Sequence, residues 1–315
     1  DAQNAKSLEA IKRAALVVCL DGGVADAEPY EVAWPRQVYR GGPNAEHAAN
    51  RWWDKPVQVI VGENGGSALL YDHTAFDGTV MAGVTNHCYN YAFLISGEQN
   101  LRLRFKYPSV RLAFRTTSLT WLFHARSLVR LSSSPFFIRT IGTPVMVYGT
   151  ASTRQFRHGR ATVYYSSSED SLSFCRVFDS PLSSRAEKEQ SLRKAVERSK
   201  QDAVSAANGL AVYRMIYALL SIALDDGIPI HPFFKHRVFG RADLIASQVN
   251  LQCDGCTFEN PTFPGIYMVM YNIRPESFIF GLSCSKSFPE RNTTKFKKAI
   301  EKALTELREC VDKGR

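Results

Sequence analysis

Residues 57–78 read VQVIVGENGGSALLYDHTAFDG, and this stretch decides the first sheet of the chain. Val57–Val61 and Ser67–His73 have strand composition, and the glycine-rich turn Gly62–Gly66 between them predicts a β-hairpin. His73 then stands at the end of the second strand, ahead of Asp77 and Gly78. An imidazole held there can keep one nitrogen bonded to the backbone and use the other to remove a proton near neutral pH. We therefore take His73 as a candidate general base, with Asp77 orienting it or pairing with an arginine.

A histidine without a supporting motif is more often a structural residue than a reactive one. The remaining six histidines are interpreted as structural: His47, His87, His124, His158, His231 and His236.

Hydrophobic spacing predicts the elements around this hairpin. Leu8, Ile11, Ala15 and Val18 recur at helical spacing, which predicts an opening helix ending near residues 21–23, followed by a Gly- and Pro-rich loop over residues 22–43. Residues 266–273 and 277–283 predict a second hairpin, so that each of two lobes has its own sheet.

Two helices are expected in the second half of the chain. Ser184 with Glu187 forms a capping box that predicts a long helix to Gly227, with Gly209 as a candidate break. The last helix is expected to start at Asn292 or Thr293, and the sequon at Asn292 is interpreted as a helix cap.

Composition excludes several classes of protein. The chain has 315 residues, of which 45% are apolar and 22% charged, which rules out disordered and collagen-like chains and suggests two lobes or one large domain. Seven cysteines are too few for a disulfide scaffold and favour a reducing compartment. No run approaches the roughly 18 apolar residues of a membrane span, so no transmembrane segment is expected.

Positive charge is concentrated in one window. Residues 101–160 contain eleven Lys or Arg and no acid, against a net charge of +9 for the whole chain. Such a window suits an anionic partner, but no nucleic-acid-binding motif accompanies it, so we expect no nucleic-acid partner.

Four blocks of sequence resemble the choline/carnitine acyltransferases, and they stand in that family's order. They are residues 50–56 (NRWWDKP), 71–78 (YDHTAFDG), 148–160 (YGTASTRQFRHGR) and 247–249 (SQV). The resemblance implies an α/β, two-lobed, CoA-dependent acyltransferase fold of the chloramphenicol acetyltransferase type. It matches only the C-terminal part of a longer pattern, so we expect an incomplete N-terminal lobe, residues 1–100, that carries the His-x-x-x-Asp-Gly motif. Residues 101–315 would form the C-terminal lobe.

The resemblance also implies the catalytic roles. His73 would take the proton from the hydroxyl of carnitine, or from the CoA thiol in reverse, and Asp77 would brace the histidine loop. Ser247 matches the last serine of the family's Ser-Thr-Ser motif and would stabilise the oxyanion. Ile245 and Ala246 replace the first two hydroxyl residues of that motif.

Tyr148 and Arg214 match residues that bind the carboxylate of carnitine in the family. A guanidinium binds a carboxylate through two parallel hydrogen bonds, although an arginine on a helix is about equally often a solvated surface residue. Ala161 and the pair Tyr164–Tyr165 depart from the family pattern in the same pocket. Arg126 and Arg130, which can share one helical face, resemble the paired lysines that hold the 3′-phosphate of CoA.

Cys253 and Cys256 form a C-x-x-C pair without a second pair at matching spacing, so we expect them to line the acyl pocket and not to bind a metal.

The sequence thus predicts a carnitine O-acyltransferase that uses carnitine and acyl-CoA, has no permanently bound cofactor, and acts as an intracellular monomer. Mitochondria or peroxisomes are the expected compartments, with the cytoplasm as a third; the ending Lys313–Arg315 is not a peroxisomal signal. The alternatives are a choline acetyltransferase, against which Arg214 argues, and a non-catalytic member or fragment of the family.

Overall fold

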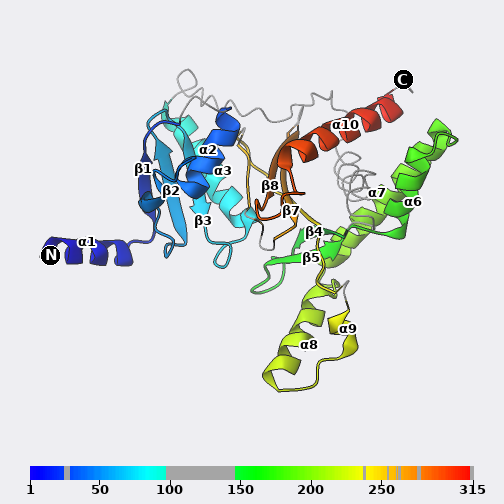
Figure 1. The fold of residues 1–315 in the computed structure, drawn as a ribbon, viewed down its shortest axis with the longest axis horizontal. Coiled ribbons are helices and arrows are strands. Elements are labelled where there is room, and N and C mark those ends of the chain that lie inside the picture. Colours follow the sequence, from blue (N-terminus) through cyan, green and yellow to red (C-terminus); the bar gives the residue numbers. More distant parts are fainter. Residues whose placement is uncertain are drawn as a thin grey trace. The chain divides into compact units, whose positions relative to one another are not determined.

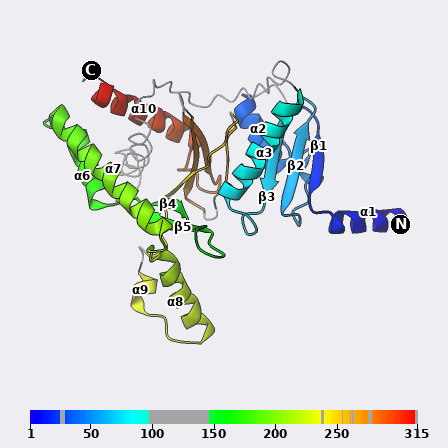
Figure 2. The same cartoon turned by 180° about the vertical axis from the view of Figure 1, so that it is seen from behind.

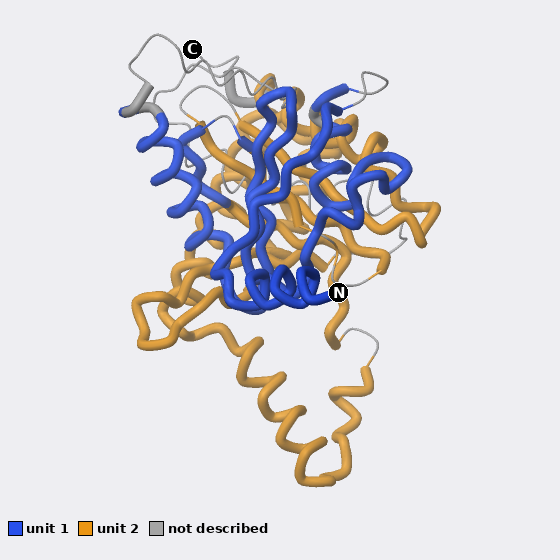
Figure 3. Tube along the Cα trace, turned by 90° about the vertical axis from the view of Figure 1, so that its left-hand side faces the viewer, with its two compact units in different colours: residues 1–109, 249–255 blue, residues 110–248, 256–315 orange. Residues whose placement is uncertain are grey.

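A computed structural model of the chain describes residues 1–24, 29–96, 146–236, 239–253, 255–259, 261, 264–274 and 278–312. Figure 1 shows their helices and strands, and Figure 3 shows the two compact units into which the chain divides. Unit 1 comprises Asp1–Ser109 and Val249–Gly255, and unit 2 comprises Val110–Gln248 and Cys256–Arg315. Each unit is a mixed α/β structure with its own sheet, as the sequence predicts. The predicted lobe boundary at residue 100 lies outside the described residues and stays a prediction.

Unit 1 is built on a three-stranded sheet in the order β1-β2-β3. Strand β1 (Val17–Asp21) runs parallel to β2 (Val57–Gly62), and β2 pairs antiparallel with β3 (Ser67–Tyr71). The core forms where buried Cys19, Ile60 and Leu70 meet Trp34 and Val38 of helix α2 (Tyr30–Arg40). Helix α3 (Gly78–Ser96) crosses the opposite face of the sheet, as Figure 2 shows.

The predicted β2–β3 hairpin is confirmed. Val57 pairs with Tyr71 and Val61 with Ser67, so the two strands are joined by a turn at the glycines that the sequence singles out. Gly65 in this turn has φ +80°, a backbone conformation that favours glycine. His73 follows the end of β3 by two residues.

The predicted opening helix is wrong in its second half. Helix α1 (Ala2–Arg13) ends at Arg13, and Val17–Asp21 forms strand β1. Val17–Asp21 is a strand because it pairs with β2. Along it a buried Cys19 alternates with an exposed Val18, and this alternation fits the edge of a sheet better than a helix.

The predicted loop over residues 22–43 is also wrong, because it contains α2. Pro29 stands directly before this helix, and Gly41, with φ +73°, directly follows it, so both are boundary residues of a helix. Only Pro35 lies inside α2, and the packing of Trp34 and Val38 against the sheet outweighs its cost.

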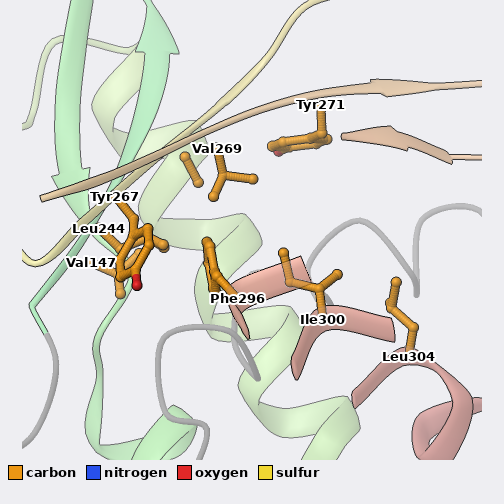
Figure 4. Packing of buried hydrophobic residues seen from close by; sticks show 9 residues of the cluster. Val147, Leu244, Tyr267, Val269, Tyr271, Phe296, Ile300 and Leu304 are labelled. Carbon is orange, nitrogen blue, oxygen red and sulfur yellow. The ribbon is translucent and has the colours of Figure 1, made fainter. Parts of the chain in front are cut away.

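Unit 2 contains a five-stranded sheet in the order β5-β4-β6-β7-β8. Its strands are β4 (Val147–Ser152), β5 (Ala161–Tyr165), β6 (Leu244–Gln248), β7 (Tyr267–Ile273) and β8 (Phe278–Cys284). The β7–β8 pair is the second hairpin that the sequence predicts. On one face of the sheet, Phe296, Ile300 and Leu304 of helix α10 (Thr293–Asp312) pack against residues of β4, β6 and β7 (Figure 4).

The remaining helices of unit 2 confirm the predicted caps. Helix α7 (Arg185–Ala207) begins with the capping box of Ser184 and Glu187, and Gly209, with φ +79°, separates it from α8 (Tyr213–Asp225). Helix α6 (Glu169–Asp179) packs on α7 through a core that includes Phe174, Leu192 and Leu307 of α10. Short helix α9 (Pro232–Lys235) follows α8. Asn292 caps α10, accepting a hydrogen bond from the backbone N–H of Lys295 at 2.9 Å.

The chain passes from unit 2 to unit 1 directly after β6. The side chain of Asn86 on α3 holds the segment Val249–Gly255 at two points: its Nδ2 donates to the carbonyl of Asn250 at 3.0 Å, and its Oδ1 accepts from the N–H of Gln252 at 2.7 Å. The sequence did not predict this crossing.

Candidate functional site

The loop between β3 and α3 holds His73 in a defined turn. The N–H of Asp72 donates to the carbonyl of Pro56 at 2.9 Å, and its carboxylate accepts from the N–H of Thr74 at 2.8 Å. This second bond, in which a side chain replaces a backbone turn contact, lowers the pKa of Asp72. His73 therefore projects from a backbone that is fixed on both sides.

Asp77 lies beside the imidazole of His73. The Nδ1 of His73 is 3.8 Å from the Oδ1 of Asp77, which is too long for a hydrogen bond but close enough for attraction to a protonated ring. The side chain of His73 is 49% exposed, whereas that of Asp77 is only 10% exposed. The pair thus places a largely buried carboxylate next to a half-exposed imidazole.

Asp77 also begins helix α3. Its carbonyl accepts from the N–H of Val80 at 3.0 Å and from that of Met81 at 3.2 Å, so Asp77 occupies the N-cap position. A carboxylate at a helix N-terminus is favourable because of the helix dipole. The same residue therefore sets the direction of α3 and supplies charge next to His73.

Three tyrosines meet at the other candidate site, in unit 2. The hydroxyl of Tyr148 on β4 donates to that of Tyr165 on β5 at 3.0 Å, and the ring of Tyr213 lies edge-on to Tyr148 at 5.6 Å. Burial, followed by the bond to Tyr165, raises the pKa of Tyr148, and burial also raises the pKa of Tyr213 to about 12. Tyr148 is therefore a neutral phenol at physiological pH. Because Tyr165 accepts from Tyr148, the hydrogen of Tyr165 remains available to a ligand.

Arg214 lies next to Tyr213 but extends to a different part of the hairpin. Its guanidinium donates to the carbonyl of Ala161 at 2.6 Å. Ala161 and Tyr165 are opposite ends of β5, about 13 Å apart at the usual rise per residue. The structure thus brings Tyr148 together with Tyr165 and Tyr213, and it holds Arg214 near the far end of the same strand.

Ser247 on β6 contacts a hydroxyl of the neighbouring strand. The Oγ1 of Thr150 on β4 donates to the Oγ of Ser247 at 2.8 Å. Since side chains alternate along a strand, Thr150 faces the same side as Tyr148, opposite to the face that packs on α10. The two predicted residues of unit 2 that lie on strands, Tyr148 and Ser247, therefore stand on paired strands of one sheet.

Comparisons with known proteins show which family the chain belongs to. A family model described as "Choline/Carnitine o-acyltransferase" matches residues 1–126 and 136–302. The chain belongs to this family. Carnitine O-acetyltransferase of Columba livia is 25% identical over 99% of this chain and 56% of its own length. Choline O-acetyltransferase of Gallus gallus is 25% identical over 99% of this chain and 55% of its own. Human carnitine O-acetyltransferase is 26% identical over 98% of this chain and 55% of its own.

The chain therefore spans about half the length of the curated acyltransferases it matches. A solved structure described as "The crystal structure of CT mutant" covers 92% of this chain and 74% of its own, with 11% identity and a TM-score of 0.39. That similarity is too low to bear on fold or function.

The remaining candidate residues are two arginines and two cysteines. Arg126 and Arg130 lie outside the described residues, and of the two only Arg126 falls within the matched ranges. Cys253 is buried in unit 1, and burial raises the pKa of Cys256 in unit 2 to about 12. In the part of the chain that the structure describes, no group of three or more His, Cys, Asp or Glu could hold a metal ion. Among the described helices, none is long and apolar enough to cross a membrane.

Sequence reasoning missed Thr150 as the neighbour of Ser247. Thr150 stands two residues after Tyr148, so strand periodicity alone places both on one face. That signal was present, but the pairing of β4 with β6 was not visible, because it joins residues far apart in the chain.

Proposed function

We propose that the protein is a carnitine O-acyltransferase that transfers acyl groups reversibly between coenzyme A and carnitine. The arrangement of His73 and Asp77 supports this proposal most directly: a half-exposed imidazole on a fixed turn, with a largely buried carboxylate 3.8 Å away, in a chain of the choline/carnitine acyltransferase family. The carnitine and choline O-acetyltransferases it resembles carry out acetyl transfer to their named alcohols.

The proposed reaction uses His73 as the general base. Its Nε2 takes the proton of the carnitine hydroxyl while the oxygen attacks the thioester carbonyl of acyl-CoA. The resulting oxyanion is stabilised by the hydroxyl of Ser247, the carbon–sulfur bond breaks, and the proton passes from His73 to the departing CoA thiolate. Asp77 braces the histidine loop from the start of helix α3 and keeps its carboxylate beside the ring during this sequence.

Arg214 supports carnitine over choline as the alcohol, whereas Tyr148 lies toward the other end of the β4–β5 hairpin. Carnitine has a carboxylate and choline does not, so a cation that binds this group distinguishes them. A guanidinium carries five N–H donors, and the bond to the carbonyl of Ala161 leaves others for a carboxylate. The second candidate, choline acetyltransferase, is favoured by the relatives of that name, which match this chain as well as the carnitine enzymes do.

Product formation tests the function. Purified protein is incubated with acetyl-, octanoyl- or palmitoyl-CoA and either carnitine or choline, and the acyl ester is measured by mass spectrometry, because seven cysteines would disturb a thiol assay. We expect acylcarnitine, and a loss of about 10²- to 10⁴-fold in kcat for His73→Ala. His87→Ala, at an exposed position of α3, is the control and should retain activity. Absence of product with both alcohols would refute the enzyme, and activity that survives His73→Ala would refute the mechanism.

Substitution of Arg214 tests the choice of alcohol. Arg214→Asn should raise the KM for carnitine by about 10- to 100-fold, as expected for loss of a charge-assisted hydrogen bond, and leave the KM for acyl-CoA within about 2-fold. Arg198→Asn, which removes an arginine paired with Asp202 on α7, should change neither constant. Equal changes in both constants for Arg214→Asn would remove its proposed role.

A further inference from the structure

The contact between Thr150 and Ser247 is the basis of a further inference, which rests on the proposed function. The Oγ1 of Thr150 donates to the Oγ of Ser247 at 2.8 Å, and both side chains are partly buried. The two strands run parallel, with Tyr148 beside Ile245 and Gly149 beside Ala246, so the next step in register brings Thr150 beside Ser247.

Both hydroxyls stand on interior strands of the sheet. Strand β4 is paired on both sides, by β5 and β6, and β6 is paired on both sides, by β4 and β7, where Ser247 lies opposite Met270. A strand that is hydrogen-bonded to a neighbour on both sides keeps its backbone position when one side chain changes. The hydroxyl of Thr150 is therefore fixed relative to that of Ser247.

The direction of the bond matters for catalysis. A hydroxyl has one hydrogen to donate and two lone pairs with which to accept. Because Ser247 accepts from Thr150, its own hydrogen is free to be donated to another oxygen, and accepting one hydrogen bond strengthens the donation of the next. A hydroxyl that stabilises a developing oxyanion must have its hydrogen available for donation in this way.

We propose that Thr150 is a positioning residue that orients and polarises the Ser247 hydroxyl toward the oxyanion of the acyl transfer. In this chain Ile245 and Ala246 carry no hydroxyl, so the strand that bears Ser247 supplies no second hydroxyl. Thr150 supplies it from the neighbouring strand. Thr150 itself does not touch the reacting atoms.

Three variants test the role. Thr150→Val keeps the shape and deletes the hydroxyl, Thr150→Ser keeps the hydroxyl, and Ser247→Ala deletes the acceptor. We expect Thr150→Val to lower kcat by about 3- to 15-fold with little change in either KM, and Thr150→Ser to restore kcat to within about 2-fold of the wild type. In the Ser247→Ala background, Thr150→Val should cause no further loss, because the two residues act as one unit. Thr305→Val, which removes a hydroxyl bonded to the Glu301 carbonyl in α10, is the control.

The outcomes separate this proposal from the function on which it rests. If the wild type forms no acyl ester, both the proposed function and the role of Thr150 are refuted. If the wild type is active and Thr150→Val has wild-type kcat, only the positioning role falls. Equal losses in Thr150→Val and Thr150→Ser, or additive losses with Ser247→Ala, would show a packing role and overturn the proposal as well.

Discussion

The side chain of Arg51 shows how a family motif can serve the fold more than the chemistry. Arg51 and Asp21 form a fully buried ion pair with N–O distances of 2.9 and 2.7 Å. The remaining N–H groups of Arg51 reach the carbonyls of Gln37, Val38 and Asn50. In the same motif, the Nζ of Lys55 donates to the carbonyls of Lys12 and Ala14 at the end of α1. The block over residues 50–56 thus joins β1, α2 and α1 and places β2, from which the hairpin leading to His73 begins.

Substitution of Asp21 should show how much this buried pair contributes to the free energy of unfolding. Burial alone would raise the pKa of Asp21, but hydrogen bonds from Arg51, Asn50 and Gln37 hold it below its usual range. A depressed carboxyl pKa stabilises the fold above the unfolded value of about 3.9, and this contribution is lost as the pH falls through the folded pKa. Asp21→Asn, which leaves Arg51 buried without its anion, should lower the free energy of unfolding by about 3–5 kcal/mol at pH 7.

Urea unfolding at a series of pH values measures both effects. The wild type should lose stability more steeply below about pH 4 than Asp21→Asn does. Asp202→Asn, which breaks the exposed pair with Arg198 on α7, should cost at most about 0.5 kcal/mol. A cost below about 1 kcal/mol for Asp21→Asn would mean that the buried pair does not support unit 1.

At the scale of elements, prediction from sequence succeeded where the partners are neighbours in the chain. Both hairpins carry their turn residues between their strands, and the capping box of Ser184 is read within four residues. Local spacing predicts a helix where β1 lies, because the partner strand β2 comes much later in the chain, after α2. The Gly and Pro residues around α2 predict a loop, although Pro29 and Gly41 mark the ends of a helix whose Trp34 packs on the sheet.

The loop that closes the β4–β5 hairpin depends on a glycine. The N–H of Thr153 donates to the carbonyl of Arg160 at 2.8 Å, and a Cβ on Gly159 would lie 2.6 Å from the carbonyl carbon of Thr153 and closer still to its oxygen. The carbonyl of Thr153 cannot move away from such a Cβ without breaking the hydrogen bond that closes the loop. Gly159→Ala should therefore lower the free energy of unfolding by about 1–3 kcal/mol, measured by thermal or urea unfolding.

A second glycine provides the matched control for this loop. Gly83 lies in α3 with open space around its missing Cβ, so Gly83→Ala should stabilise the protein by about 0.5–1 kcal/mol. Gly159→Ala should also weaken the bond between Arg214 and Ala161, since Ala161 directly follows the loop. Equal effects of the two substitutions would contradict the steric explanation.

At the scale of the whole molecule, the proposed reacting groups are divided between the two units. His73 and Asp77 belong to unit 1, whereas Tyr148, Arg214 and Ser247 belong to unit 2. Each of them could be proposed from a short block of sequence. The contact of Ser247 with Thr150 could not, because it joins residues 97 apart, and neither could the crossing of the chain into unit 1 directly after Gln248.

Net charge gives a prediction at this scale that depends on no single residue. The chain carries +9, and residues 101–160 contain eleven Lys or Arg without an acid. The phosphates of acyl-CoA make it a polyanion, so the field of the protein should attract it and raise its rate of association. Salt shortens the range of this field, from about 10 Å at 0.1 M to about 3 Å at 1 M.

Steady-state kinetics at increasing NaCl tests this steering. Between about 0.05 M and about 0.5 M salt, kcat/KM for acyl-CoA should fall by about 3- to 10-fold, while kcat at saturating substrate changes little, because the field acts on encounter and not on the chemical step. Carnitine is a zwitterion without net charge, so its KM should stay within about 2-fold over the same range and serves as the internal control. A parallel decline for both substrates would point to a general effect of salt on the protein, and a constant kcat/KM for acyl-CoA would mean that the positive window does not guide it.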